Sequence, residues 1–284
     1  MKNVLVTGGN GFVGSILTKK LFKEGYNVSI TSRKKHKNSY TKVFDPLEKI
    51  PYDLFKNIDV VYHLLALTHD IKGKKSSSLY EKVNFQTTKD LAIKASNDGV
   101  KSFIFLSSTK AMGMEGKRSR IKEKSRGMPN DDYGKSKGKA EEFLLEFSKT
   151  TTMKVVILRA PLVYGPGVKG NLKNLLVMMK HPLIPVIRKS NKRSMVSVYS
   201  LCEALIFLND YENLKNITYI VTDNKEYSIY DICVEIKLCT KNSKYFTIPN
   251  WILYFLGYLG NILNFIFEFP LDISRVRKLM SNEY

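Results

Sequence analysis

Short apolar runs alternate with segments of helical period over the first two thirds of the chain. The apolar runs lie at 2–7, 27–31, 58–65, 102–107 and 154–159. Between them, apolar residues recur every three or four positions, which predicts helices over 12–24, 79–98 and 132–149. This alternation predicts an α/β fold with a doubly wound parallel sheet. Because the carboxyl ends of parallel strands meet at one edge, we expect the functional residues there.

The alternation weakens after Pro161, where a mixed pattern follows. It indicates a smaller C-terminal lobe that packs beside the sheet, and we expect this lobe to bind substrate. We therefore predict one domain over 1–160 and a lobe over 161–284, interleaved rather than independent, because no linker, repeat or low-complexity tract separates them.

The first strand runs into three glycines, Gly8, Gly11 and Gly14, at the spacing G-x-x-G-x-x-G. Without a Cβ, the first allows a tight turn, the second lets a pyrophosphate approach the backbone, and the third lets helix and strand pack closely. The helix N-terminus then faces the phosphates. Three glycines also occur in plain turns, but the position between strand and helix predicts a dinucleotide-binding turn of the Rossmann type.

The end of the second strand bears on the choice of cofactor. NAD enzymes carry an acidic residue there for the ribose 2′-hydroxyl, whereas this chain has Ser32 and Arg33. An arginine pairs well with a 2′-phosphate. The sequence therefore favours NADP, with NAD as the alternative.

Tyr133 and Lys137 form a Y-x-x-x-K pair at the start of a predicted helix, which puts phenol and ammonium on one face. A neighbouring cation favours the phenolate and brings the phenol toward acid or base work. Ser108 ends the strand FIFLSS and is expected at the carboxyl edge of the sheet, where its hydroxyl can share the proton of a substrate oxygen. The pair alone is a weak signal, and the glycine turn and the serine strengthen it.

Motifs at five places resemble the extended short-chain dehydrogenase/reductases: TGGNGFVG, HLLA at 63–66, LSSTKAMG at 106–113, YGKSK at 133–137 and LRAPLVYGPG at 158–167. The resemblance covers nearly the whole chain. Within that superfamily, SSTKAMG, APLVYGPGVKGN and RSMVSVYSLCEA are similar to bacterial 4-keto reductases that form UDP-N-acetylquinovosamine for O-antigen and capsule. UDP-glucose 4-epimerases are close relatives of these enzymes.

The resemblance implies roles for individual residues. Ser108, Tyr133 and Lys137 would be the catalytic trio, with Lys137 also holding the nicotinamide ribose. The implied substrate-binding residues are Ser108, Lys110, Asn171 and Arg193, the last at the UDP diphosphate. The implied cofactor-binding residues are Gly8, Asn10, Gly11, Phe12, Val13, Gly14, Ser32, Arg33, Asp45, Pro46, Leu65, Ala66, Tyr133, Lys137 and Ala160.

Several positions depart from the family pattern. Dehydratases place Asp and Glu directly after the catalytic hydroxyl residue, whereas this chain has Thr109 and Lys110, which argues against water elimination. Met112 replaces the usual aromatic residue, and Ser200 replaces the usual aspartate of a late V-x-D motif. The chain also ends short of the family's usual terminal helix.

Three functions follow. The first is NADPH-dependent reduction of the C4 keto group of a UDP-4-keto-6-deoxy-N-acetylhexosamine in surface polysaccharide synthesis. The second is NAD-dependent 4-epimerisation of a UDP-sugar by the same trio. The third is a non-catalytic or membrane-associated cofactor-binding protein, against which the intact trio argues. By the same resemblance, the helices over 79–98 and 132–149 are the expected pairing surface of a homodimer.

Composition narrows the setting. The 284 residues include 43% apolar residues, an ordinary share for a soluble globular protein. Three irregularly spaced cysteines predict neither a disulfide framework nor a metal site, which favours the cytoplasm. The apolar run after Lys2 is too short for a signal peptide.

The chain carries a net charge of +20, with its lysines scattered and without regular interleaving of aromatic residues. This distribution disfavours a nucleic-acid site and favours an anionic small substrate or an anionic membrane surface. The segment 251–267 has no charged residue, but Gly257, Gly260, Asn261 and Asn264 interrupt it. The pattern favours a buried or membrane-surface helix pair over a bilayer span.

Overall fold

The computed structural model describes residues 1–34, 40–68, 76–114, 121–179, 183–187, 192–211, 214, 217–240, 244–264, 273 and 276. The chain divides into two compact units. The first comprises Met1–Met114, Ile121–Val168 and Val196–Asp223, and the second comprises Glu115–Arg120, Lys169–Met195 and Asn224–Tyr284.

A seven-stranded parallel sheet forms the centre of the first unit. Its strands, from edge to edge, are β10 (Thr218–Ile220), β6 (Lys154–Ala160), β5 (Ser102–Ser108), β4 (Val60–His63), β1 (Asn3–Thr7), β2 (Asn27–Ser32) and β3 (Thr41–Val43). The strand order reverses between β1 and β4, which confirms the predicted doubly wound α/β fold. All five predicted strands are present, with ends that shift by no more than a few residues.

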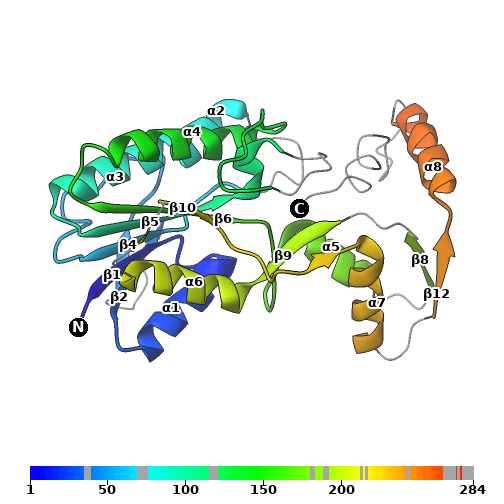
Figure 1. Ribbon diagram of the computed structural model, residues 1–284, viewed down its shortest axis with the longest axis horizontal. Coiled ribbons are helices and arrows are strands. Elements are labelled where there is room, and N and C mark those ends of the chain that lie inside the picture. Colours follow the sequence, from blue (N-terminus) through cyan, green and yellow to red (C-terminus); the bar gives the residue numbers. More distant parts are fainter. Residues whose placement is uncertain are drawn as a thin grey trace. The chain divides into compact units, whose positions relative to one another are not determined.

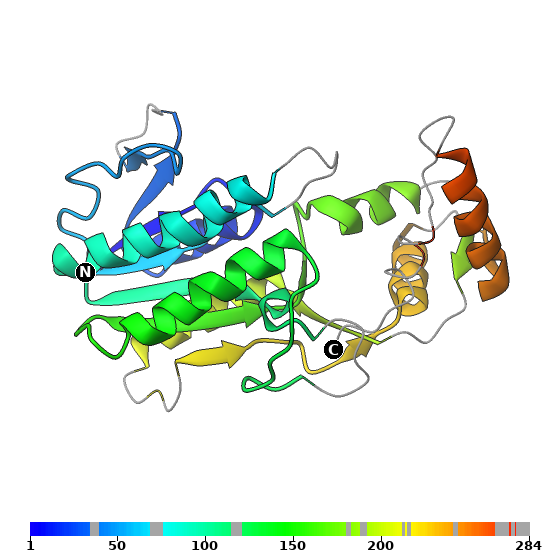
Figure 2. The same cartoon turned by 90° about the horizontal axis from the view of Figure 1, so that it is seen from above.

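The two faces of the sheet are covered by different helices. Val4 and Val6 pack on one face in a cluster that includes residues of α1 (Phe12–Lys23) and α6 (Val198–Asp210). Leu5 packs on the opposite face with residues of α3 (Thr87–Asn97) and α4 (Asp132–Phe147). Figure 1 shows these two helix layers on either side of the sheet, and Figure 2 shows the layer of α3 and α4 in front of it. Because neighbouring residues of a strand point to opposite faces, one continuous apolar run supplies both halves of the core.

The helix predicted over 79–98 has three parts: α2 (Ser77–Tyr80), a π-helical turn η1 (Glu81–Gln86), and α3. Two threonine hydroxyls donate to backbone carbonyls of this segment. Thr87 Oγ1 donates to the carbonyl of Lys82 over 3.0 Å, and Thr88 Oγ1 donates to the carbonyl of Asn84 over 2.7 Å. The widened turn contains Asn84, whose side chain is fully buried.

Shorter elements complete the first unit. A 3-10 turn, η2 (Thr109–Met112), follows β5 directly, and β7 (Leu162–Tyr164) follows β6. Gly113 ends η2 with a φ of +62°, a left-handed conformation that favours glycine.

The second unit contains α5 (Gly170–Met178), β8 (Leu183–Ile187), β9 (Arg193–Ser197, whose last two residues belong to the first unit), β11 (Glu226–Tyr227), α7 (Ile229–Thr240), β12 (Lys244–Ile248) and α8 (Asn250–Leu263). β8 pairs with β12 in parallel, and β9 pairs with β11 antiparallel. Met179 and Cys233 are buried in its core.

Only part of the charge-free segment 251–267 can be compared with the structure. α8 covers its first residues, and 265–267 lie outside the described residues. Within the described part of the chain, every helix falls short of the length and hydrophobicity that crossing a bilayer requires.

Candidate active site

The glycine turn between β1 and α1 fits a diphosphate. Gly8 has a φ of +73°, and its carbonyl accepts the Gly11 N–H over 2.8 Å. A Cβ on Gly14 would overlap the Gly8 carbonyl oxygen, so this close packing requires glycine. Gly11 caps α1 and offers no side-chain acceptor to the first N–H groups of the helix. These N–H groups suit the phosphate oxygens of a dinucleotide.

The other expected cofactor residues follow the strands of the same sheet. Ser32 ends β2 and is half-buried, and Arg33 beside it is exposed. The carboxylate of Asp45 accepts the N–H of Leu47 over 2.9 Å and so stabilises the turn that begins at Asp45. Leu65 lies against the glycine turn, because a Cβ on Gly8 would be 2.9 Å from the Leu65 nitrogen.

A buried histidine joins the ends of two strands. His63 Nδ1 lies 2.7 Å from Thr7 Oγ1, and Nε2 lies 2.9 Å from Thr88 Oγ1. The Thr88 hydroxyl donates to Asn84, so it accepts from Nε2–H, and Nδ1 accepts from Thr7. Burial, together with the charge of Lys137, lowers the pKa of His63 to about 3. The neutral imidazole of His63 therefore links the end of β4 to Thr7 at the end of β1 and to Thr88 in α3.

Ser108 and Tyr133 come together at the carboxyl edge of the sheet. Ser108 is the last residue of β5 and pairs in register with Ala160 of β6. Tyr133 lies in the first turn of α4. Burial raises the pKa of Tyr133 to about 12, and the charge of Lys110 and a hydrogen bond with Ser108 act in the opposite direction. The phenol is therefore protonated at neutral pH.

Lys137 is buried one helical turn after Tyr133. Its side chain is fully enclosed, and Nζ lies 4.0 Å from the centroid of the Phe105 ring. Burial lowers the pKa of Lys137 to about 7, although the charge of Glu141 partly offsets this effect. A cation held in this way is poorly stabilised and is ready to bind acceptor groups of a ligand.

A buried ion pair anchors the same helix to the sheet. Arg159 of β6 donates from Nε to both oxygens of Glu141 over 3.0 and 3.1 Å, and from Nη2 over 2.6 Å. Its Nη1 donates to the carbonyl of Glu123 over 2.7 Å. Because both charges are enclosed and hydrogen-bonded, the pair fixes α4 against β6.

Lys110 lies close enough to Tyr133 for its charge to act on the phenol. Its Nζ donates to Asp131 Oδ2 over 2.6 Å, and Asp131 Oδ1 accepts the Gly134 N–H over 2.7 Å. Asp131 is thus both the N-cap of α4 and the partner of the lysine. The arrangement holds the Lys110 charge near the Tyr133 phenol.

Asn84 connects the π-helical turn to this helix. Its Nδ2 donates to Ser136 Oγ over 3.0 Å and to the Leu67 carbonyl over 3.0 Å. Ser136 Oγ donates in turn to the Tyr133 carbonyl over 2.8 Å. The network fixes the backbone of Tyr133 relative to the loop after β4.

Two expected substrate residues belong to the second unit. Arg193 begins β9 and is half-buried. Asn171 lies in the first turn of α5, and its side chain is outside the described residues. Their roles stay predictions.

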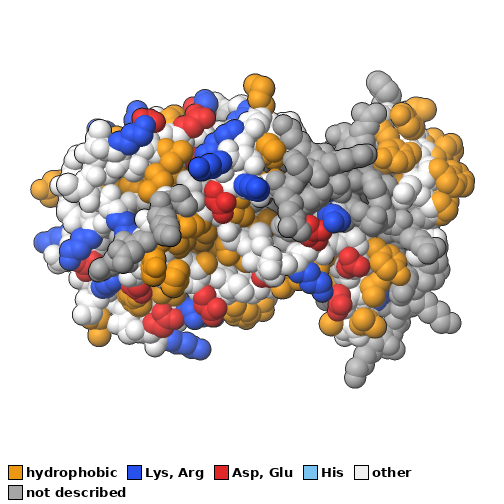
Figure 3. All heavy atoms as spheres, viewed as in Figure 1, with side chains coloured by type: hydrophobic (Ala, Val, Ile, Leu, Met, Phe, Trp, Pro, Cys, Tyr) orange, Lys and Arg blue, Asp and Glu red, His pale blue; other side chains and the backbone are white. Residues whose placement is uncertain are grey.

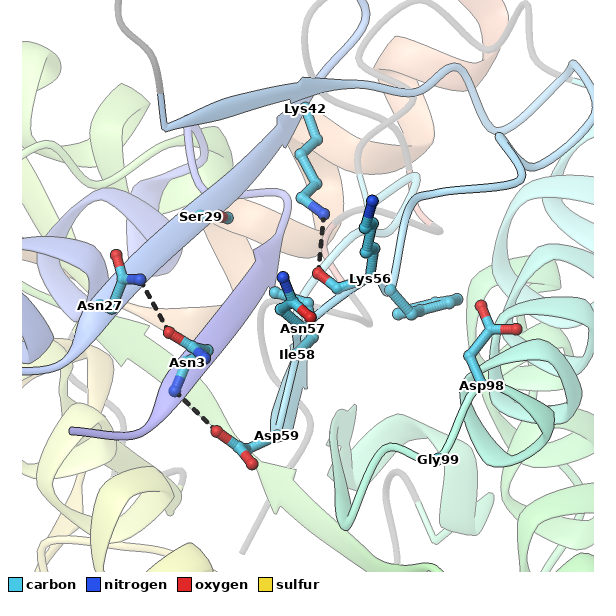
Figure 4. A pocket seen from close by; sticks show the side chains of 11 residues that line it. Asn3, Asn27, Ser29, Lys42, Lys56, Asn57, Ile58, Asp59, Asp98 and Gly99 are labelled. Atoms are coloured by element: carbon cyan, nitrogen blue, oxygen red, sulfur yellow. Dashed lines mark hydrogen bonds between the residues drawn. The ribbon is translucent and has the colours of Figure 1, made fainter.

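The opposite edge of the sheet bears an open polar hollow, shown in Figure 4. It lies at the amino ends of β1 and β2 and is lined by Asn3, Asn27, Lys42, Asp59 and Asp98, among others. Lys42 Nζ donates to the carbonyls of Asp53 and Leu54 over 3.2 and 2.9 Å, so its donors serve the adjoining turn. The hollow has none of the predicted site residues.

Sequence reasoning missed several residues that support the site. Asp131 and Glu141 carry weak local signals, an acidic N-cap and an i,i+4 spacing from Lys137. His63 belongs to the HLLA motif, but neither its role nor that of Asn84 could be read from the sequence, because their partners are distant along the chain. The described residues include no cluster of three or more His, Cys, Asp or Glu suited to a metal ion.

Comparisons with known proteins bear on this geometry. A model of the "NAD dependent epimerase/dehydratase family" matches residues 4–221. A UDP-glucose 4-epimerase of Vibrio cholerae is 34% identical over 270 residues, which cover 91% of this chain and 82% of the relative. The N-acetyl-alpha-D-glucosaminyl-diphospho-ditrans,octacis-undecaprenol 4-epimerase of Escherichia coli O157:H7 is 28% identical over 269 residues, which cover 91% and 77%.

Solved structures show the same fold. MoeE5 in complex with UDP-glucose and NAD matches with a TM-score of 0.74 at 24% identity, over 86% of this chain and 85% of the other. The UDP-glucuronic acid 4-epimerase of Bacillus cereus in complex with NAD matches with a TM-score of 0.72 at 22% identity, over 86% and 87%.

Proposed function

This chain belongs to the NAD-dependent epimerase/dehydratase family and is an enzyme of the nucleotide-sugar epimerase/dehydratase type, and on that premise we propose that it is a UDP-sugar 4-epimerase that uses NAD. The observation that carries the proposal is the contact between Ser108 and Tyr133 at the carboxyl edge, followed by Thr109 and Lys110. Two hydroxyls there suit proton transfer at a sugar oxygen, and Thr109 and Lys110 supply no acid and base for elimination.

The hydroxyls act on the C4 oxygen of the sugar. Tyr133 takes the proton when C4 is oxidised and returns it when C4 is reduced, while Ser108 donates a hydrogen bond to the same oxygen. A nicotinamide bound beyond the glycine turn supplies the hydride chemistry. Since the pKa of Tyr133 is about 12 in the free protein, the base role depends on nearby positive charge that stabilises the phenolate.

The two lysines supply that charge in different ways. Lys110 is fixed by Asp131 and lowers the pKa of Tyr133 directly. Lys137 is enclosed, and we assign its ammonium to the ribose hydroxyls of the cofactor. Ribose oxygens would satisfy its donors and raise its pKa from about 7.

UDP as the carrier of the sugar is supported by the 4-epimerase from Vibrio cholerae. Arg193 and Asn171 are the proposed diphosphate contacts, and Lys110 is the proposed contact to the sugar. The relative from Escherichia coli is named for a sugar on diphospho-undecaprenol, so the substrate panel includes a polyprenyl-diphosphate sugar.

A second candidate is the reduction of a UDP-4-keto-6-deoxy-N-acetylhexosamine with NADPH. The exposed Arg33 after β2 favours it, because an arginine there suits a 2′-phosphate and neither Ser32 nor Arg33 carries a negative charge to repel it. In this reaction the same trio would support one reduction of C4, whereas epimerisation requires an oxidation of C4 followed by its reduction.

One experiment separates the candidates. The purified protein is tested for retained NAD, and then mixed with UDP-glucose or UDP-N-acetylglucosamine without added cofactor while NMR follows the C4 configuration. An epimerase converts the sugar to the 4-epimer and leaves the cofactor unchanged. A reductase leaves these sugars untouched and oxidises added NADPH stoichiometrically with the 4-keto sugar.

The proposed setting is cytoplasmic synthesis of bacterial surface polysaccharide, such as O-antigen or capsule. We also propose a homodimer that pairs through α3 and α4, by analogy with relatives that form four-helix bundles. Cross-linking between cysteines introduced on these helices tests the pairing.

A further inference from the structure

An apolar stripe runs along the exposed side of α8. Trp251, Phe255, Tyr258 and Ile262 are 68%, 61%, 55% and 63% exposed. Their spacing of four, three and four residues places them on one face of the helix. Figure 3 shows hydrophobic side chains gathered over α8. Four large apolar side chains along a single helix face differ from the scattered exposed residues of an ordinary surface.

The opposite side of α8 is already occupied within the second unit. Leu253 is buried, and a Cβ on Gly257 would lie 2.9 Å from Val276 Cγ2. Asn261 Oδ1 accepts the Ile273 N–H over 3.2 Å. The helix therefore packs through this side, and the aromatic stripe is not needed for that packing.

We propose that the stripe formed by Trp251, Phe255, Tyr258 and Ile262 binds α8 along the surface of an anionic phospholipid bilayer. Trp and Tyr rings combine apolar area with a polar group and suit the boundary between headgroups and acyl chains. The helix has 14 residues and a length of about 21 Å, shorter than the hydrocarbon core of about 30 Å. It therefore lies in the interface rather than across the bilayer.

Charge favours a membrane over a second copy of the chain as the partner. The chain carries a net charge of +20, and 251–267, which contains most of α8, has no acidic residue that anionic headgroups would repel. A net positive charge strengthens the binding of a protein with an apolar helix face to anionic lipids. Two copies of the chain, each with this net charge, repel one another as they approach.

A second helix, α6, differs from α8 in its charge and serves for comparison. α6 also exposes aromatic residues, Tyr199 and Phe207, at 55% and 59%. Glu203 lies between them on the same face, and Phe207 stacks on Tyr211 with ring centroids 5.2 Å apart. An acidic residue in the middle of the face opposes insertion among anionic headgroups, so α6 is the matched control.

Trp251 gives a direct measurement because it is the only tryptophan of the chain. The full chain is titrated with phosphatidylcholine vesicles, with and without a share of phosphatidylglycerol. The proposal expects a blue shift of Trp251 emission with the anionic vesicles, reduced by salt, and quenching by brominated lipid. An unchanged emission with both vesicle types would overturn it.

Flotation with the same vesicles tests the stripe itself. The double variant Trp251→Ser with Phe255→Ser should weaken binding at least about tenfold, because two apolar side chains no longer leave water. The double variant Tyr199→Ser with Phe207→Ser should bind like the original. Circular dichroism confirms that each variant retains its fold.

Two further outcomes would overturn the proposal. Equal binding by the α8 variant and the original chain would place the lipid contact elsewhere. A dimer in light scattering that the α8 substitutions dissociate, with no vesicle binding, would assign the stripe to a second copy of the chain.

Discussion

The two edges of the central sheet are made by the same strands, yet Asp59 at one edge and His63 and Lys137 at the other differ in whether their surroundings favour the charged form. At the amino edge, Asp59 accepts the Asn3 N–H over 2.9 Å and pairs with Lys101 over 2.8 Å. The Lys101 bond and the Asn3 bond lower the pKa of Asp59, so its charged form is stabilised. At the carboxyl edge, burial works against the charged forms of His63 and Lys137 and moves their pKa values to about 3 and about 7.

This difference distinguishes groups that stabilise the fold from groups that can interact with a ligand. A charged group that is already paired within the protein contributes to the stability of the fold and gains little from contact with a ligand. A group held against its preferred protonation state gains when a ligand supplies the missing partner. We therefore propose that the reaction takes place at the carboxyl edge and not at the open hollow of the amino edge. Four paired substitutions or measurements test this contrast, from the largest expected effect to the smallest.

Removal of one tyrosine hydroxyl at each edge gives the largest contrast. Tyr133→Phe should lower kcat for the sugar nucleotide by about 10²- to 10⁴-fold, because the proton donor and acceptor at C4 is lost. Tyr26→Phe removes a hydroxyl that donates to Asp210 over 2.8 Å near the amino edge and should leave kcat unchanged. Steady-state kinetics measures both. Near-normal turnover by Tyr133→Phe would contradict the assignment.

Alanine in place of one glycine at each edge compares their packing. Gly14→Ala should reduce the free energy of unfolding by about 3 kcal/mol or more, because the new Cβ overlaps the Gly8 carbonyl. Gly99→Ala meets open space at a φ of +80° and should cost only about 1 kcal/mol. Urea denaturation measures the difference, and equal losses would show that the glycine turn tolerates a side chain.

Acid should affect the two edges at different pH. His63 has a pKa of about 3 when folded and about 6.5 when unfolded, so the unfolded chain binds more protons between these values. The free energy of unfolding should therefore fall as pH falls below about 6.5, by about 2 kcal/mol at pH 5. The lowered pKa of Asp59 makes its contribution vanish only below about pH 4.

Urea midpoints at several pH values measure this loss. NMR of the His63 ring gives an independent readout and should show a neutral imidazole throughout the range. Stability that stays constant from neutral pH to pH 5 would contradict the burial effect on His63.

Loss of one lysine charge at each edge gives the smallest effect. Lys110→Met removes the cation that lowers the pKa of Tyr133, so kcat near neutral pH should fall about tenfold and recover partly as pH rises. Lys101→Met breaks the pair with Asp59, in which Lys101 is largely exposed. It should leave kcat unchanged and should alter the free energy of unfolding by no more than about 1 kcal/mol. If the pH–rate profile of Lys110→Met shows no shift, the proposed effect of Lys110 on the pKa of Tyr133 is wrong.

Much of the fold could be predicted from the sequence because the relevant signals are local. Apolar runs and helical periods lie within a few turns of chain, and so do the glycine spacing and the pair of Tyr133 and Lys137. The parallel order of the strands then follows from general rules of chain crossover. This is enough to locate Ser108 and Tyr133 at one edge.

The supporting contacts could not be predicted in the same way. Asn84 meets Ser136 across 52 positions, and His63 meets Thr7 across 56. Such pairs depend on the finished fold and leave no pattern in either segment alone. The same limit applies to α8, where the absence of charge is visible in the sequence but the exposed side of the helix is not.

The location of the site can be measured directly by hydrogen exchange. Backbone exchange of the full chain is compared with and without NAD and UDP-glucose. The account predicts slower exchange at the glycine turn, at the end of β5 and in the first turn of α4. It predicts no change at the hollow of the amino edge, which Asn57, Asp59 and Gly99 also line. Protection at the amino edge, with the carboxyl edge unaffected, would contradict it.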